Sequence, residues 1–251
     1  MMKHEGGIFV FSDAHLMEFT PKDQPRFALG MALAKKARIV IANGDIIEPK
    51  HQKQVWESKW REFLEVIKQK GVVLGGNHDK ITTLRKMRPF WAKLAGIYRF
   101  TSNNTRFVVT HGDRFDTALN WDKGLDWKII DKWYLSIKFL EERLTLPGNR
   151  NLLTWFYRSW NEEQKKRFHE IATPTERKIA GHTHLAEIDV FNFYVNIGSF
   201  NRQRPSWAWI EDGNISLHIF GNPVAQTIHR DQKCHSHAIM SSPFPRDCVH
   251  D

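Results

Sequence analysis

The first third of the chain alternates between short apolar runs and longer stretches of helical periodicity. Residues 7–11, 38–42 and 72–74 are rich in β-branched and other apolar residues, which is typical of strands buried on both faces. Residues 26–37 and 52–70 carry apolar side chains at the spacing of an amphipathic helix. Strands and helices in this order predict a parallel sheet with right-handed crossover connections.

The pattern changes after residue 80. Residues 80–95 have helical character with a break near Pro89, and residues 117–173 form two predicted helical stretches on either side of Pro147. The remaining apolar runs are short, and they predict a second, mostly antiparallel set of strands. These strands are expected near residues 97–100, 105–110, 177–180, 186–190, 193–196, 207–210 and 215–220. The fold class is therefore expected to be α/β, or α+β in some schemes.

A chain of 251 residues is long enough to bury a large core in one domain with an elaboration. We expect this domain to span residues 1–221 and to contain residues 117–173 as a helical insertion. Residues 222–251 show no apolar periodicity, so a disordered tail is expected there.

The net charge and the cysteine content indicate which partners and which cellular compartment to expect. The net charge of +9 and the pI near 9.6 favour a polyanionic partner, such as nucleic acid, a nucleotide or an anionic lipid surface. Cys234 and Cys248 are the only cysteines, which fits a reducing cytoplasm. The sequence has neither a signal-peptide stretch at its start nor about 18 uninterrupted apolar residues. We therefore expect a cytoplasmic protein that is soluble or at most peripheral to a membrane.

Clusters of Asp, Asn and His follow five of the predicted strands. On extended backbone, side chains two residues apart point to the same side, so Asp13 and His15 can reach one ion. The carboxyl ends of strands in an open α/β sheet are where sites form, so the clusters are expected to converge. They are Asp13-Ala14-His15, Gly44-Asp45, Gly76-Asn77-His78-Asp79, His111-Gly112-Asp113 and Gly181-His182-Thr183-His184.

The residue types in these clusters suit divalent cations. Nitrogen and oxygen ligands without a thiolate favour Mn, Fe, Zn or Mg over a structural cysteine-zinc site. Taken singly, His182 and His184 would be read as polar turn residues, and Asp13 with His15 would be a weak signal. The full set in order, with strand context, is specific.

This ordered set resembles that of the calcineurin-like metallophosphoesterase superfamily, over roughly residues 7–220. The resemblance implies a sandwich of two sheets flanked by helices. It also implies two divalent metal ions, with manganese as the first choice and iron, zinc or magnesium as alternatives. One metal would be held by Asp13, His15 and His184, and the other by Asn77, His111 and His182, with Asp45 bridging both.

The same resemblance implies a mechanism. Two metals about 3.5–4 Å apart would convert a shared water into a hydroxide that attacks phosphorus in line. His78 is similar to the catalytic histidine of the family, which stabilises the developing charge or protonates the leaving oxygen, and Asp79 is expected to orient it. Asp113 is expected to hydrogen-bond a ligand histidine rather than bind metal.

The insertion joins the cluster at His111 to the cluster at His182, so it is placed to cover the metals as a cap. Its apolar residues either pack the helices together or line a groove for acyl chains or bases. A cap in this position resembles the branch that includes UDP-2,3-diacylglucosamine hydrolase, although that branch has arginine where this chain has His78. Substrate phosphate or headgroup charge would be accepted by Arg114, Lys123, Lys128, Arg150 and Arg158, unless these only form a solvated face.

The leading functional hypothesis is a dinuclear-metal phosphohydrolase that cleaves a phosphoester or pyrophosphate bond, with a nucleotide-sugar lipid or a related phosphorylated small molecule as substrate. The alternative is a nuclease or cyclic-nucleotide phosphodiesterase, which the basic charge permits. A third hypothesis, a catalytically silent interaction scaffold, fits less well because every ligand and His78 are present.

Overall fold

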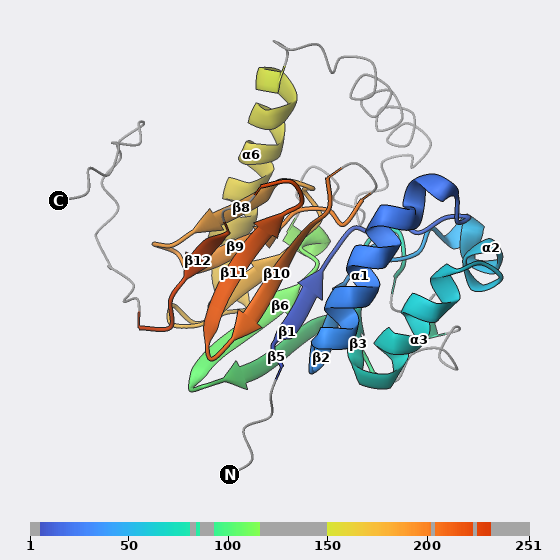
Figure 1. Cartoon of the computed structure of the whole chain (residues 1–251). Coiled ribbons are helices and arrows are strands. Elements are labelled where there is room, and N and C mark those ends of the chain that lie inside the picture. The colour runs from blue at the N-terminus through green and yellow to red at the C-terminus, as the bar shows by residue number, and fades with distance from the viewer. Residues whose placement is uncertain are drawn as a thin grey trace.

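The computed structural model of the chain describes residues 6–80, 84–85, 93–115, 150–201, 204–222 and 225–231, with the backbone alone for residues 150–157. Within this part of the chain, two sheets stack into a sandwich with helices on the outside (Figure 1). The expected architecture is therefore confirmed.

The larger sheet has seven strands and combines the first strands of the chain with the last. Its parallel part consists of β1 (Ile8–Phe11), β2 (Ile39–Asn43), β3 (Gly71–Leu74) and β4 (Leu94–Ala95). Its antiparallel part consists of β10 (Ser206–Glu211), β11 (Asn214–Ile219) and β12 (Gln226–Ile228). Because β10 pairs with β1, the strand order is β12-β11-β10-β1-β2-β3-β4.

The smaller sheet has five strands in the order β5-β6-β7-β9-β8. These strands are β5 (Ile97–Ser102), β6 (Thr105–Thr110), β7 (Arg177–Ala180), β8 (Ala186–Asp189) and β9 (Tyr194–Ile197). The three central strands are parallel to one another, and β5 and β8 are antiparallel edge strands.

Helices flank both sheets. Those on the outer face of the larger sheet are α1 (Gln24–Lys36), α2 (Gln52–Trp56) and α3 (Trp60–Lys70). Beside the smaller sheet stands α6 (Arg150–Arg167) (Figure 1). Four short 3-10 turns also occur in the described part, namely η1 (Pro21–Asp23), η2 (Pro49–His51), η4 (Asp113–Phe115) and η6 (Phe168–Glu170).

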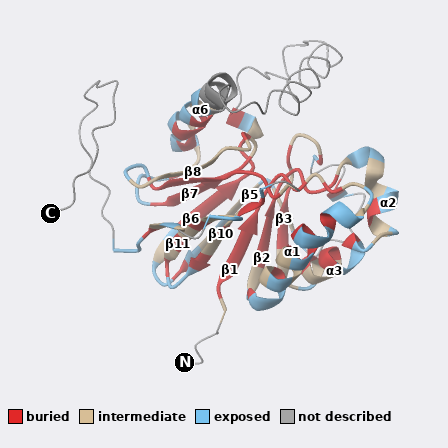
Figure 2. Cartoon of the chain, turned by 45° about the horizontal axis from the view of Figure 1, so that its top comes forward, coloured by how far each residue is buried: buried red, intermediate tan, exposed pale blue. Residues whose placement is uncertain are grey.

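Successive side chains of β1 enter two different cores, which explains why this strand is apolar throughout. Phe9 and Phe11 face the helices, where the rings of Phe11 and Phe63 of α3 lie 5.5 Å apart. Ile8 and Val10 face the other way, into the core between the two sheets. The buried residues in Figure 2 accordingly run along the strands of both sheets. This double burial fixes the strand ends, and the loops that follow them carry the clusters.

The expectation of a second, mostly antiparallel set of strands is wrong in two respects. β10 and β11 belong to the larger sheet, and β6, β7 and β9 of the smaller sheet are parallel. Hydrophobic alternation shows which side chains face a core, but it does not specify which strand edges pair.

The helix predicted over residues 52–70 is divided into α2 and α3. The Ser58 hydroxyl donates to the Val55 carbonyl oxygen at 2.8 Å and accepts from the Trp60 amide at 3.2 Å. One serine thus satisfies groups at the end of α2 and at the start of α3, which favours a break at this point.

The predicted end of one helix and the predicted start of the disordered tail differ from the structure. Leu94–Ala95 forms β4 instead of the end of a helix, and Gln226–Ile228 forms β12 inside the segment expected to be a disordered tail. Pairing with β11 satisfies the backbone of residues 226–228 without any apolar periodicity. Of the expected insertion, the helix after Pro147 is confirmed as α6, and residues 116–149 lie outside the described part.

No helix in the described part of the chain is long and apolar enough to cross a bilayer.

Candidate metal centre

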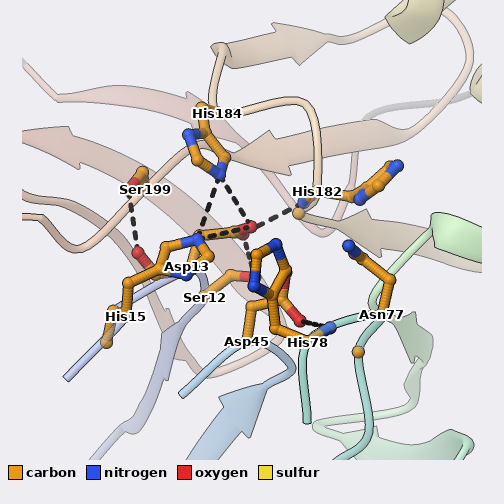
Figure 3. Close-up of polar contacts among 12 residues, drawn as sticks. Ser12, Asp13, His15, Asp45, Asn77, His78, His182, His184 and Ser199 are labelled. Atoms are coloured by element: carbon orange, nitrogen blue, oxygen red, sulfur yellow. Dashed lines mark hydrogen bonds and ion pairs between the residues drawn. The ribbon is translucent and has the colours of Figure 1, made fainter. Parts of the chain in front are cut away.

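The five clusters converge at one edge of the sandwich, as the strand pattern predicts (Figure 3). They lie on the loops that follow β1, β2, β3, β6 and β7. The loops after β1 and β2 remain paired beyond the strands, since the Asp13 amide donates to the Gly44 carbonyl at 3.1 Å and the His15 amide donates to the Asp45 carbonyl at 2.9 Å. Backbone pairing therefore sets the spacing of the two carboxylates.

Asp13 lies at the centre of the first group of donors. Its Oδ1 atom is 3.1 Å from His184 Nε2 and 4.0 Å from His15 Nε2, and the two Nε2 atoms are 3.3 Å apart. Asp13 Oδ1 is buried and receives no well-formed hydrogen bond from the residues that the structure describes. One carboxylate oxygen and two imidazole nitrogens thus face one another within 4.0 Å, and a cation would stabilise this arrangement.

Asp45, Asn77 and His111 make up most of the second group. His111 Nε2 lies 3.3 Å from Asn77 Oδ1 and 3.4 Å from Asp45 Oδ2. The other ring nitrogen, Nδ1, is 2.8 Å from the Asn43 carbonyl oxygen, so Nδ1 carries the hydrogen and Nε2 presents its lone pair. Asp45 also lies near His15 and His78, so its carboxylate touches both groups of donors.

His182 takes a different position from the other predicted ligands. Its ring packs against that of His111 with the centroids 5.2 Å apart, and its backbone amide donates to Asp13 Oδ2 at 3.0 Å. In Figure 3 the His182 ring lies on the same side of the site as Asn77, opposite His15 and His184. His182 thus lies near the two residues with which it is predicted to share a metal, and the metal assignment itself stays a prediction.

Close packing of the loops depends on Gly181. A Cβ atom at this position would collide with Ser12 Oγ and Asp13 Oδ2. The Ser12 hydroxyl donates to Asp13 Oδ2 and contacts the Asn43 carbonyl oxygen at 2.6 Å. A side chain at residue 181 would therefore push the loop that bears two histidines away from Asp13.

Most of the predicted ligand residues have a left-handed backbone. This conformation is uncommon for residues other than glycine, and each instance costs of order 1–3 kcal/mol, which the surroundings must supply. Such strain concentrates at functional sites. The residues and their φ angles are Asp13 (52°), His15 (42°), Asp45 (53°), His182 (72°) and His184 (58°).

The carboxylates of Asp13 and Asp45 stay ionised despite their burial. Burial alone would raise the pKa of Asp13, but the His111 and His184 imidazoles lower it to about 2. Burial likewise opposes ionisation of Asp45, and His111 and its neighbours bring the pKa well below its ordinary value. In turn, burial alone would lower the pKa of His111, yet the charges of Asp45 and Asp13 raise it well above the usual value. Two buried carboxylates that require positive charge beside them are suited to divalent cations.

Glu48 is a member of the site that the sequence analysis missed. Its Oε1 atom lies 2.8 Å from His15 Nδ1, and its Oε2 atom lies 3.4 Å from His78 Nδ1. The carboxylate therefore orients a predicted ligand and the predicted catalytic histidine together. The pKa of Glu48 is lowered, because these two imidazoles outweigh the effect of burial. The available signal was its position three residues after Asp45 on the same loop.

His78 lies at the edge of the site, where its side chain is 22% exposed. Its backbone amide donates to Asp45 Oδ1 at 2.9 Å, and its Nε2 atom is 4.0 Å from Asp45 Oδ2. Burial alone would lower the pKa of His78, but the hydrogen bond with Glu48 and the charge of Asp45 raise it.

Asp79 does not orient His78, so the expected role for this residue needs correction. Its carboxylate accepts hydrogen bonds from the backbone amides of Asp45, Ile46, Ile47 and Gly76, at 2.6 to 3.3 Å. Burial and the neighbouring Asp45 charge raise the pKa of Asp79 to about 7. Asp79 ties the loop after β3 to the loop after β2, and Glu48 takes the orienting position next to His78.

Asp113 also differs from its expected role. The Nδ1 atom of His111 is bound by the Asn43 carbonyl, so a backbone oxygen orients this ring in place of Asp113. Asp113 begins η4 and acts on His111 through its charge, which helps to raise the pKa of the imidazole.

Of the five predicted substrate contacts, the structure describes the side chains of Arg114 and Arg158. Arg114 is exposed and lies over the Phe115 ring, and Arg158 is exposed on α6. The side chain of Arg150 is not described, and Lys123 and Lys128 lie outside the described residues.

The donor set fits divalent metal ions. Three groups of carboxylate and imidazole donors each have their ligand atoms within 4.8 Å of one another: Asp13 with His15 and His184, His15 with Asp45 and His78, and Asp13 with Asp45 and His111. Mixed oxygen and nitrogen donors with oriented imidazoles are characteristic of transition-metal sites in hydrolases.

This fold and this site define the class of metal-dependent phosphoesterases. The sequence matches the calcineurin-like phosphoesterase family over residues 7–221, and the chain belongs to that family. It is accordingly a phosphoester hydrolase. No match to a curated protein was found.

Distant structural likenesses accompany the family match. A conserved uncharacterized protein from Streptococcus pneumoniae TIGR4, described as a predicted phosphoesterase, is 17% identical, with 88% of this chain and 96% of that chain covered and a TM-score of 0.42. A dimetal phosphatase from Danio rerio is 11% identical, with 90% and 99% covered and a TM-score of 0.45. At these scores the likenesses add no argument about chemistry.

Proposed function

We propose that this chain is a dinuclear-metal phosphohydrolase that cleaves a phosphoester or pyrophosphate bond. The observation that carries the proposal is the convergence of two buried carboxylates, Asp13 and Asp45, with the Nε2 atoms of His15, His111 and His184. Asp13, His15 and His184 would hold one metal, Asn77, His111 and His182 the other, and Asp45 would bridge them. Two divalent cations bound there would acidify a shared water and neutralise phosphate charge.

Residues around the metals would orient the ligands and supply a proton. The Asn43 carbonyl and Glu48 hold the rings of His111 and His15 so that their Nε2 atoms face inward. His78 would donate a proton to the leaving oxygen, and the support is the position of its ring at the solvent-exposed edge, with Nε2 4.0 Å from Asp45 Oδ2.

For the substrate, we propose a nucleotide-sugar lipid or a related phosphorylated small molecule, bound under a cap formed by residues 117–173. The support is sequence position, since this segment joins the loop of His111 to the loop of His182. Manganese is proposed as the metal, and the cytoplasm as the location because the chain has only two cysteines. A nuclease or cyclic-nucleotide phosphodiesterase is the alternative, favoured by the net charge of +9.

A metal-supplemented hydrolysis panel tests these proposals. Protein stripped with EDTA and reloaded with Mn²⁺ would be assayed on a nucleotide-sugar lipid, cyclic nucleotides, aryl phosphate mono- and diesters, and DNA. We expect two bound Mn²⁺ per chain and turnover only after reloading. Steep salt dependence with preference for DNA would favour the nuclease. Two bound metals without turnover of any substrate would contradict the proposal of a hydrolase acting on these classes.

Glu48→Gln should reduce kcat/KM by about 10–100-fold, the usual effect of removing a residue that orients a metal ligand. The amide has the same shape, but it cannot accept hydrogen bonds from both His15 and His78 as a charged group does. Glu57→Gln is the matched control, since Glu57 is 64% exposed at the end of α2. Steady-state kinetics with excess Mn²⁺ measure the effect, and equal activity of the two variants would remove Glu48 from the site.

A further inference from the structure

Helix α6 is attached to the loop that carries His182 and His184. The attachment is made by Asn161 and Gln164, whose side chains are buried with 0% and 2% exposure. Both residues belong to the segment expected as the cap, and Figure 1 shows α6 rising from the end of the smaller sheet. Two buried amides at this point require hydrogen-bond partners, and the site loop provides them.

Asn161 binds the residue between the two histidines. Its Oδ1 atom accepts hydrogen bonds from the Thr183 hydroxyl at 2.5 Å and from Asn196 Nδ2 at 2.8 Å. Its Nδ2 atom donates to Glu187 Oε2 at 2.7 Å. Thr183 is fully buried, so its hydroxyl needs these partners in order to stay in place.

Gln164 binds the same loop one residue before His182. Its Nε2 atom donates to the Gly181 carbonyl at 3.4 Å, and its Oε1 atom accepts from the Tyr194 hydroxyl at 2.7 Å. A Cβ atom at Gly112 would collide with Gln164 Nε2, so the same amide also lies against the loop of His111. One side chain of α6 therefore contacts two loops that bear predicted ligands.

The histidine loop needs such support. His182 and His184 both have left-handed φ angles, 72° and 58°, and Thr183 lies between them. On the side facing the site, the His182 amide is held by Asp13 Oδ2 at 3.0 Å. On the opposite side, Asn196 Nδ2 lies 3.0 Å from the Gly181 carbonyl oxygen and 2.9 Å from Thr183 Oγ1, alongside the contacts from α6. The loop is thus clamped between Asp13 and the amides of α6 and β9.

We propose that Asn161 and Gln164 are positioning residues for the metal centre, acting through Thr183 and Gly181 on His182 and His184. The inference rests on the proposed function, because it assigns both histidines to metals. It makes the base of the expected cap a part of the metal centre. The two histidines serve different predicted metals, so loss of this support weakens binding of both.

Removal of one hydroxyl tests the inference. Thr183→Val keeps the volume and removes the hydrogen bonds, whereas Thr183→Ser keeps the hydroxyl. Titration of the metal-free proteins with Mn²⁺ alone, followed by electron paramagnetic resonance, measures loading independently of activity. We expect Thr183→Val to need about tenfold more Mn²⁺ for half-loading, at the lower end of effects on residues behind metal ligands, and Thr183→Ser to stay close to the wild type. Excess Mn²⁺ should restore hydrolysis by Thr183→Val.

Glu162→Gln is the matched control for a change on the same helix. Glu162 is 59% exposed and pairs with Lys165, also on α6, at 2.7 Å. It makes no hydrogen bond to the histidine loop among the described residues. Glu162→Gln is expected to leave Mn²⁺ loading unchanged. Gln164→Met provides a second test through Gly181, for use where Thr183→Val does not fold.

Failure of the positioning role and failure of the proposed function give different results. A wild-type chain that binds Mn²⁺ and hydrolyses phosphate esters, together with Thr183→Val and Gln164→Met variants that load Mn²⁺ like the wild type, would overturn this inference alone. Equal weakening by Glu162→Gln would show a general effect of the helix and would also overturn it. A wild-type chain without Mn²⁺ binding would overturn the proposed function and this inference with it.

Discussion

Asp45→Asn should abolish measurable hydrolysis and leave the protein with fewer than two bound metals. The variant removes a negative charge that lies next to both groups of donors, and an amide cannot bridge two cations as a carboxylate does. Loss of several kcal/mol of transition-state stabilisation corresponds to a rate decrease of roughly 10³-fold or more. Metal analysis after gel filtration and kcat/KM with excess Mn²⁺ measure the two effects.

Asparagine suits this position because it tolerates the left-handed backbone of Asp45, whose φ angle is 53°. Asp212→Asn is the matched control: Asp212 has a φ angle of 50° and lies exposed in the turn between β10 and β11. The control should keep both metals and full activity. Turnover of Asp45→Asn close to that of the control would remove Asp45 from its bridging role.

His78→Ala should keep both metals and slow turnover by about 10²–10⁴-fold, the range for loss of a general acid. His78 touches Asp45 through its backbone amide, which alanine retains, so the carboxylate should stay in place. The effect should be smaller for substrates with good leaving groups, which need no proton. Rates on aryl phosphodiesters with leaving groups of different pKa measure this dependence.

His169→Ala is the control for this variant, because His169 is exposed in η6 and should be silent. Loss of metal in His78→Ala would show that His78 is a ligand, as its place beside His15 and Asp45 would allow. A uniform loss of rate across all leaving groups would contradict the role of proton donor.

The convergence of the proposed ligands could be predicted from sequence, because each of them follows a strand that its apolar residues mark as buried. Val10 and Phe11 of β1 lead directly to Asp13, and Val109 and Thr110 of β6 lead to His111. Once the strands are placed, the polar residues after them are confined to one edge of the sandwich.

The residues that hydrogen-bond the predicted ligands or their loops could not be predicted in this way. Asp79 and Glu48 are both acidic residues close to His78 in the folded chain, and only the turn geometry shows that Asp79 faces backbone amides while Glu48 faces imidazoles. Hydrogen bonds to backbone leave no pattern in a sequence. Asn161 and Thr183 are 22 residues apart, and nothing in the sequence shows that their side chains are in contact.

The pairing of β1 with β10 has a consequence for synthesis of the protein. β1 and its loop leave the ribosome before β10, which is the strand that covers the free edge of β1 and which ends at Glu211. Until β10 has formed, one edge of β1 has unpaired backbone N–H and C=O groups between apolar side chains. Such an edge is a template for unwanted pairing between chains. Fragments that stop before residue 206 should therefore aggregate, even though they contain every predicted metal ligand.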